Sequence, residues 1–207
     1  MMHLTILDNG LRVASRSMQS VETVAVGLYA ETGSRYEPAR ANGLAHLFEH
    51  MVFKGAGGRS AREISELVED VGGDLNASTD RESTAFYASL LSADLPLGVR
   101  IIADLVRRPH FDAYHLALEK KVVRQWLAEA RDAACDIVFD HLQEAAFPSQ
   151  PMGRSVLGSD ASIEAITTDD LHAWLSAHYR SNRLLLVAAG KVDHEFLVEL
   201  VQENFGD

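Results

Sequence analysis

A histidine–glutamate–histidine cluster at residues 46–50 has the residue types and spacing that best suit chemistry. On a helix, His46 and His50 lie about 40° apart around the axis and one turn apart along it, so both imidazoles can reach one metal ion. Glu49 lies about 60° to the other side of His46, where it can touch a metal-bound water without being a ligand. Zinc lowers the pKa of such a water, and a carboxylate can take its proton as hydroxide attacks a carbonyl. Two surface histidines on an amphipathic helix are the alternative.

The elements that must position this cluster alternate between strands and helices. Apolar residues at three-to-four spacing predict the helix that carries the histidines at about 42–54, and alternating residues around Asn9-Gly10 predict an N-terminal hairpin. The stretch 148–168 is expected to be a polar loop, too long for a simple connector and so a candidate functional segment. Further strands are expected at 74–79, 83–91 and 184–189, and further helices at 60–71, 94–107, 113–134, 137–147, 168–179 and 193–204.

This pattern predicts an α+β fold, a layer sandwich in which helices pack on one face of a mostly antiparallel sheet. A chain of 207 residues with 47% hydrophobic and 24% charged residues can bury a sizeable core, and we expect a single domain over 1–207. The formal net charge of −11 argues against nucleic acid and anionic membrane surfaces as partners, and it suits a basic peptide. The sequence shows no secretory signal and no membrane-spanning run, so a cytoplasmic location is expected.

Several segments, in order across essentially the whole chain, resemble those of the pitrilysin/insulinase-type zinc peptidases, in the branch that includes mitochondrial processing peptidase. These segments are Gly33-Ser-Arg, Gly43-Leu-Ala-His46-Leu-Phe-Glu49-His50-Met-Val-Phe-Lys54-Gly, Gly72-Gly73-Asp-Leu-Asn76-Ala77-Ser-Thr79, Pro151-Met-Gly-Arg154-Ser-Val-Leu-Gly158 and His178-Tyr179.

The resemblance implies a role for each matching residue. His46 and His50 would bind Zn²⁺, and Glu49 would be the general base. An edge strand would pair with an extended peptide substrate through backbone hydrogen bonds; its residues are Asn76, Ala77, Ser78 and Thr79. Without the resemblance, a plain turn from helix to strand is the favoured explanation of the glycines and the asparagine of this segment, because both residue types are common in turns.

The sequence departs from the family at the third zinc ligand, which the resemblance places seven residues after another glutamate on the long downstream helix. Glu119 matches that earlier glutamate, and with Glu49 it completes the predicted catalytic set. The ligand position itself is Trp126, and an indole cannot bind zinc. Three interpretations remain open: Glu119 substitutes from about 10.5 Å along the axis, Glu129 substitutes from one turn further on, or the site binds metal weakly or not at all.

Two functions follow from these residues. The intact motif favours a zinc-dependent endopeptidase that hydrolyses extended peptides, whereas Trp126 favours a catalytically impaired relative that binds peptides or serves as a partner subunit. Members of the family are built from two homologous halves, and this chain resembles the metal-bearing half alone. The resemblance therefore implies a partner: a second homologous half, or another subunit in a homo- or heterodimer.

Overall fold

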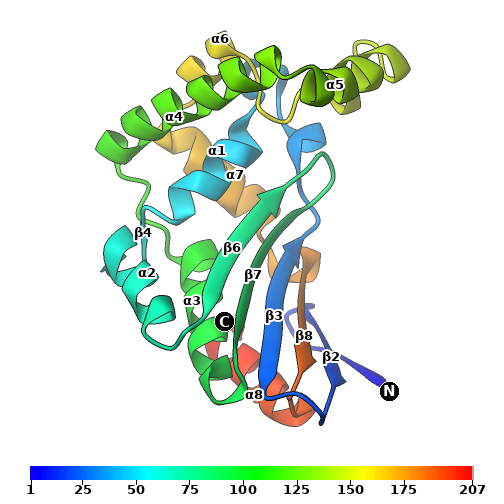
Figure 1. The fold of residues 1–207 in the computed structure, drawn as a ribbon, viewed down its shortest axis with the longest axis vertical. Coiled ribbons are helices and arrows are strands. Elements are labelled where there is room, and N and C mark those ends of the chain that lie inside the picture. Colours follow the sequence, from blue (N-terminus) through cyan, green and yellow to red (C-terminus); the bar gives the residue numbers. More distant parts are fainter. Residues whose placement is uncertain (207) are drawn as a thin grey trace.

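The computed structural model describes residues 1–206 apart from the side chain of Asp136. Its central element is a six-stranded sheet in the order β1-β2-β8-β3-β7-β6 (Figure 1). Only the β2–β8 pair is parallel, and the other pairs in this sheet are antiparallel. The strands are β1 (Met2–Ile6), β2 (Arg12–Ser17), β3 (Thr23–Ala30), β4 (Gly55–Ala56), β5 (Arg59–Ser60), β6 (Asp74–Thr79), β7 (Thr84–Leu91) and β8 (Leu184–Gly190), with β4 and β5 pairing separately.

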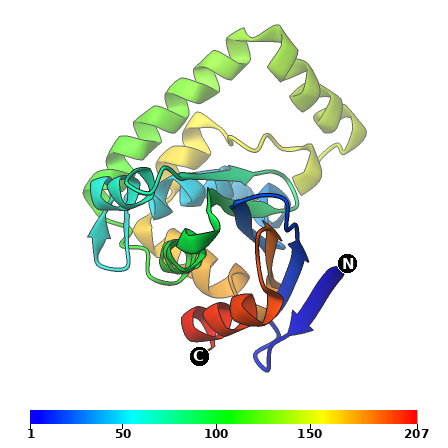
Figure 2. The same cartoon turned by 60° about the horizontal axis from the view of Figure 1, so that its bottom comes forward.

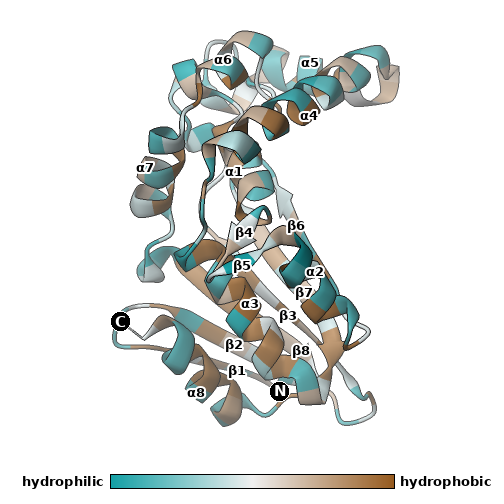
Figure 3. Cartoon of the chain, turned by 90° about the vertical axis from the view of Figure 1, so that its left-hand side faces the viewer, coloured by the Kyte–Doolittle hydropathy of each residue, from teal (hydrophilic) through white to brown (hydrophobic). Residues whose placement is uncertain are grey.

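Helices cover one face of the sheet, and those that pack directly on it come from distant parts of the chain (Figures 2 and 3). In the strands β3 and β7, residues on that face are buried, whereas Tyr29 and Tyr87 on the opposite face are partly exposed. The α-helices are α1 (Leu44–Val52), α2 (Ala61–Glu69), α3 (Leu95–Arg107), α4 (Ala113–Asp132), α5 (Ala134–Ala146), α6 (Asp160–Ala165), α7 (Thr168–His178) and α8 (His194–Phe205). The predicted fold class is therefore confirmed.

The core lies between the sheet and these helices. Its largest fully buried side chains include Leu28 and Phe86 from the strands and Phe48 from α1. Among the described residues, no helix has both the length and the apolar character needed to cross a membrane.

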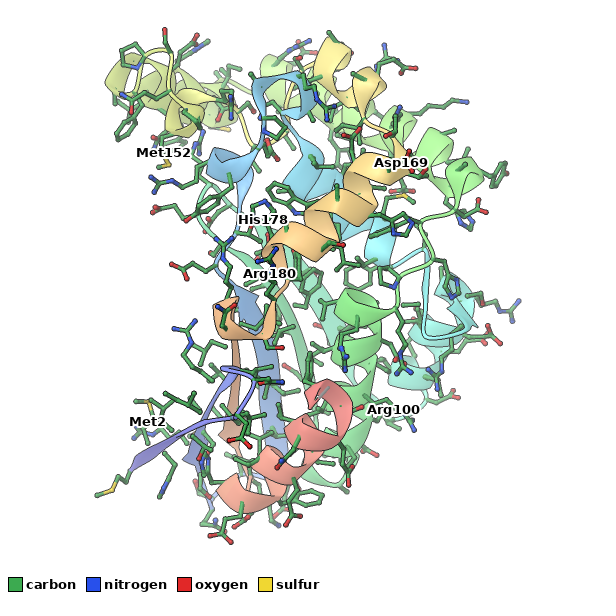
Figure 4. The ribbon with its side chains drawn as sticks, turned by 180° about the vertical axis from the view of Figure 1, so that it is seen from behind. Met2, Arg100, Met152, Asp169, His178 and Arg180 are labelled. Carbon is green, nitrogen blue, oxygen red and sulfur yellow. The ribbon has the colours of Figure 1, made fainter. Side chains whose placement is uncertain are left out.

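One prediction about the chain between α5 and α7 was wrong. The stretch 148–168 is not a continuous loop, because it contains a 3-10 turn at Pro151–Gly153 and the short helix α6. Ser159 accepts a hydrogen bond from the N–H of Ser162, which caps α6 and explains why a helix begins in this polar stretch. Figure 4 shows α7, which follows, running from Asp169 at one end to His178 at the other.

Candidate active site

The helix α1 holds the predicted site against the core. Its apolar side chains are buried, and the ring of Phe48 stacks on that of Tyr179 with centroids 4.7 Å apart. The opposite side of α1 carries His46, Glu49 and His50 toward α4 and β6. The predicted helix therefore positions all three residues of the cluster together.

The two histidines lie side by side, with ring centroids 4.7 Å apart. Glu119 of α4 lies 2.9 Å from His50 Nδ1 through one carboxylate oxygen, and its other oxygen pairs with Lys54 Nζ at 2.9 Å. When Nδ1 of His50 carries the proton, it donates to Glu119 and leaves the lone pair of Nε2 free. A carboxylate that fixes the ring of a metal-binding histidine in this way is a recurrent feature of metal sites.

Burial shifts the pKa values of His46 and Glu49. The pKa of His46 falls to about 4, first because burial disfavours the cation and second because His50 is close, so His46 is neutral at physiological pH. Its Nδ1 atom is buried and has no hydrogen-bond partner among the described residues. Burial also raises the pKa of Glu49 above its usual value, and a hydrogen bond from Thr79 Oγ1 works against this shift.

Trp126 packs against both histidines. Its ring centroid lies 4.9 Å from that of His50 and 5.9 Å from that of His46, and 44% of the residue is exposed. The indole thus lies beside the two histidines, on α4, the helix on which the family resemblance predicts the third zinc ligand.

The donor set does not fit a complete zinc site. Within the described part of the chain, no three His, Cys, Asp or Glu side chains form a group that could hold a metal ion. Both oxygens of Glu119 are engaged by His50 and Lys54, and Glu129 is exposed and accepts a hydrogen bond from Gln125 Nε2 at 2.9 Å. A catalytic zinc site uses three protein ligands, and here two imidazoles are in place.

The predicted peptide-binding segment forms β6, whose outer edge pairs with no strand in the described structure. Successive N–H groups of a strand point to opposite edges. Asp80 N–H, at the end of β6, donates to Ser83 on the β7 side, so odd-numbered residues point their N–H groups outward. Accordingly, Ala77 N–H donates to the side chain of Asn76 rather than to β7. Thr79, on the same strand, contacts Glu49 and so joins this open edge to α1.

A buried glutamate that sequence reasoning missed lies at the start of α1. Glu37 is 3% exposed, and its carboxylate accepts hydrogen bonds from Gly43 N and Asn42 Nδ2 at 2.8 Å and from Ala45 N at 2.7 Å. The one available signal was indirect: glycine, which has no capping side chain, precedes the helix, so the cap had to come from elsewhere.

We expect Glu37 to make stability depend on pH between about 4.5 and 7. Burial raises the pKa of its carboxyl to about 7, against the opposing effect of its hydrogen bonds and of Arg154. Because the folded chain then holds a proton that the unfolded chain releases, the free energy of unfolding falls as pH rises through this window, by roughly 2–4 kcal/mol. Denaturant unfolding at several pH values measures this, and Glu37→Gln should flatten that part of the profile. An unchanged profile in the variant would refute the assignment.

The chain also resembles known proteins in sequence. The sequence profile of Insulinase (Peptidase family M16) matches residues 12–160, and that of the Peptidase M16 inactive domain matches residues 165–207. The chain is 39% identical over 202 residues to the probable mitochondrial-processing peptidase subunit beta of Arabidopsis thaliana, covering 98% of this chain and 38% of that protein. It is 39% identical over 204 residues to the same-named subunit of Rattus norvegicus, covering 99% of this chain and 42% of that protein. The chain thus spans about two fifths of the length of these relatives.

Solved structures share the fold. A protease from Helicobacter pylori superposes with a TM-score of 0.94 at 23% identity, and a peptidase M16 inactive domain from Pseudomonas fluorescens with 0.92 at 19%. The matches cover 99% and 100% of this chain, respectively, and 50% of each solved chain. The profile match over most of the sequence identifies the chain as a member of the insulinase family of peptidases, M16.

Proposed function

We propose that this chain is a peptide-binding half of a processing-peptidase-like protein, and that its own zinc-dependent hydrolysis is impaired. The observation that carries the proposal is the packing of Trp126 against His46 and His50 on the helix that would supply the third ligand. Two imidazoles without a third protein ligand fall short of the coordination that a catalytic zinc site needs.

The peptide would bind as an added strand on β6. Ala77 N–H faces the open edge, and its hydrogen bond to the Asn76 side chain satisfies it in the free protein. An incoming peptide carbonyl can replace that side-chain oxygen without disturbing the pairs that join β6 to β7. Main-chain recognition of this kind tolerates many side chains, which suits a protein that binds diverse extended peptides.

We expect Ala77→Pro to weaken peptide binding by about tenfold, because proline removes the N–H that faces the open edge. The fold should survive, since proline is tolerated in an edge strand where its missing N–H faces solvent. Fluorescence anisotropy with a labelled, lysine-rich extended peptide measures the affinity, and circular dichroism checks the fold.

Ser78→Ala is the matched control for this substitution. It removes an exposed hydroxyl from the neighbouring residue and leaves every backbone donor of the strand intact. Main-chain recognition predicts that Ser78→Ala binds the peptide as the unmodified chain does. If Ala77→Pro binds equally well, or if Ser78→Ala loses as much affinity, the peptide does not bind by strand addition at this edge.

The net charge of the chain and the lengths of its relatives support two further parts of the proposal. A formal charge of −11 favours the approach of basic peptides. The relatives are named as subunits and are more than twice as long as the matched region, so we propose that a second homologous half completes the binding site, either in the same protein or in a partner subunit.

A zinc endopeptidase is the second candidate function. The grouping of His46, Glu49 and His50 favours it, as does the contact between Glu119 and His50 that would orient a ligand. In this case Glu49 acts as the general base and Glu119 as a supporting catalytic residue. A quenched fluorogenic peptide distinguishes the candidates: the endopeptidase predicts cleavage that Glu49→Gln abolishes, whereas an impaired site predicts no cleavage above that of the variant.

A further inference from the structure

The helix α1 begins without a capping side chain of its own. Its N-cap residue is Gly43, with φ of 95°, which has no side chain that could accept a hydrogen bond from the first turn of the helix. A Cβ atom at this position would lie 2.5 Å from Ile163 Cδ1 and 2.8 Å from Leu157 O, so only glycine fits both the backbone conformation and the close approach of the 155–158 segment. Another part of the chain must therefore satisfy the first N–H groups of α1.

Glu37 supplies the missing cap from outside the helix. One carboxylate oxygen accepts from Gly43 N and Asn42 Nδ2, and the other accepts from Ala45 N. The carboxylate thereby contacts the backbone immediately before His46, the first histidine of the site. A negative charge at a helix N-terminus also interacts favourably with the helix dipole.

The segment after the 3-10 turn at Pro151–Gly153 forms hydrogen bonds with Glu37 and with Asn42, which precedes α1. Arg154 Nη2 donates to the main-chain oxygen of Glu37 at 2.6 Å, and Asn42 Nδ2 also donates to Ser155 O at 3.0 Å. Figure 4 shows Met152, in the same turn, beside the end of α5. Part of the stretch that the sequence marked as a candidate functional segment is thus tied to the start of α1.

We propose that Glu37 is the positioning residue of the site, and that with Asn42 and Arg154 it fixes where α1 presents His46, Glu49 and His50 to α4 and β6. The histidines face Trp126 and Glu119 on one neighbour, and Glu49 contacts Thr79 on the other. A small displacement of α1 along its axis changes all of these contacts together, because the three side chains project from one short helix. The proposal concerns the placement of α1 and holds whether or not the site hydrolyses peptides.

Glu37→Gln tests the proposal, because glutamine keeps the shape of the side chain and replaces one acceptor oxygen with a donor that faces backbone N–H groups. Two measurements at pH 8 report on α1. We expect the Ala45 amide to exchange with solvent about tenfold faster, since it loses a hydrogen bond to a charged group. We also expect the ring-nitrogen NMR signals of His46 and His50 to shift, because their neighbours change as α1 moves.

Asp193→Ala is the matched control, since Asp193 is a carboxylate that caps α8 by accepting from Phe196 N at the opposite end of the molecule (Figure 1). A loss of stability alone would appear in both variants, but only Glu37→Gln should move the histidine signals. Unchanged histidine signals in Glu37→Gln, or equal shifts in Asp193→Ala, would overturn the proposal. If Glu37→Gln does not fold, Asn42→Ala removes the donor shared by Glu37 and Ser155 and must shift the same signals.

Discussion

We expect the Trp126→Glu variant to bind about one zinc ion per chain, because the substitution adds the third protein ligand that a catalytic site requires. The rest of the arrangement is already in place. The two imidazoles lie 4.7 Å apart between ring centroids, and Glu119 is placed to hold the ring of His50. Trp126 is 44% exposed, so a shorter side chain there leaves little buried space unfilled. Isothermal titration with zinc measures the stoichiometry and affinity of the variant.

Trp126→Gln is the control for this gain of binding. Glutamine has the shape of glutamate, but its neutral amide lacks the carboxylate that zinc prefers. Zinc binding that appears in Trp126→Glu and not in Trp126→Gln would identify the carboxylate as the missing ligand. If Trp126→Glu binds zinc no better than the unmodified chain, the tryptophan is not what limits the site.

Phe48→Ala should lower the free energy of unfolding by about 3–5 kcal/mol, the cost of removing a large ring from a packed core. Phe48 is fully buried, and its ring contacts those of Tyr179 and Phe111 at centroid distances of 4.7 and 5.4 Å. It lies between the two histidines in the sequence, so the same five residues carry both the site and the core contact that seats α1. Denaturant unfolding followed by circular dichroism measures the loss.

Phe139→Ala provides the comparison, because Phe139 lies on α5 and is 66% exposed. Removing an exposed ring changes stability by at most about 0.5 kcal/mol. Equal losses for Phe48→Ala and Phe139→Ala would show that α1 is not anchored through Phe48.

Local sequence patterns predicted those parts of the fold in which periodicity and capping agree. The spacing of apolar residues predicted a helix at about 42–54, and α1 spans Leu44–Val52 within those limits. Ser60 and Glu63 form a capping box at the start of α2, the helix expected at 60–71, and this signal depends only on residues three apart. The order of the strands, with β8 from the end of the chain between β2 and β3, depends on long-range packing that no local pattern encodes.

In the candidate site, too, local spacing was predictable from the sequence and long-range contacts were not. The spacing of His46, Glu49 and His50 placed all three on one helix. The distance of about 10.5 Å along α4 indicated that the Glu119 side chain cannot easily reach the ligand position held by Trp126. Glu37 could not be predicted as a capping residue, because its partners lie up to eight residues away and meet it only after the chain turns back on itself. The contact between Thr79 and Glu49 likewise requires β6 to pack against α1.

The zinc content of the unmodified chain tests the central claim most directly. The protein is expressed, dialysed against a stoichiometric amount of zinc and then against metal-free buffer, and its metal is measured by elemental analysis. The proposed impaired site predicts less than about 0.2 zinc ions per chain, since two imidazoles do not hold the ion against dialysis. About one zinc ion per chain, lost when His46 or His50 is replaced by alanine, would contradict the account and establish a zinc site that functions with Trp126 in place.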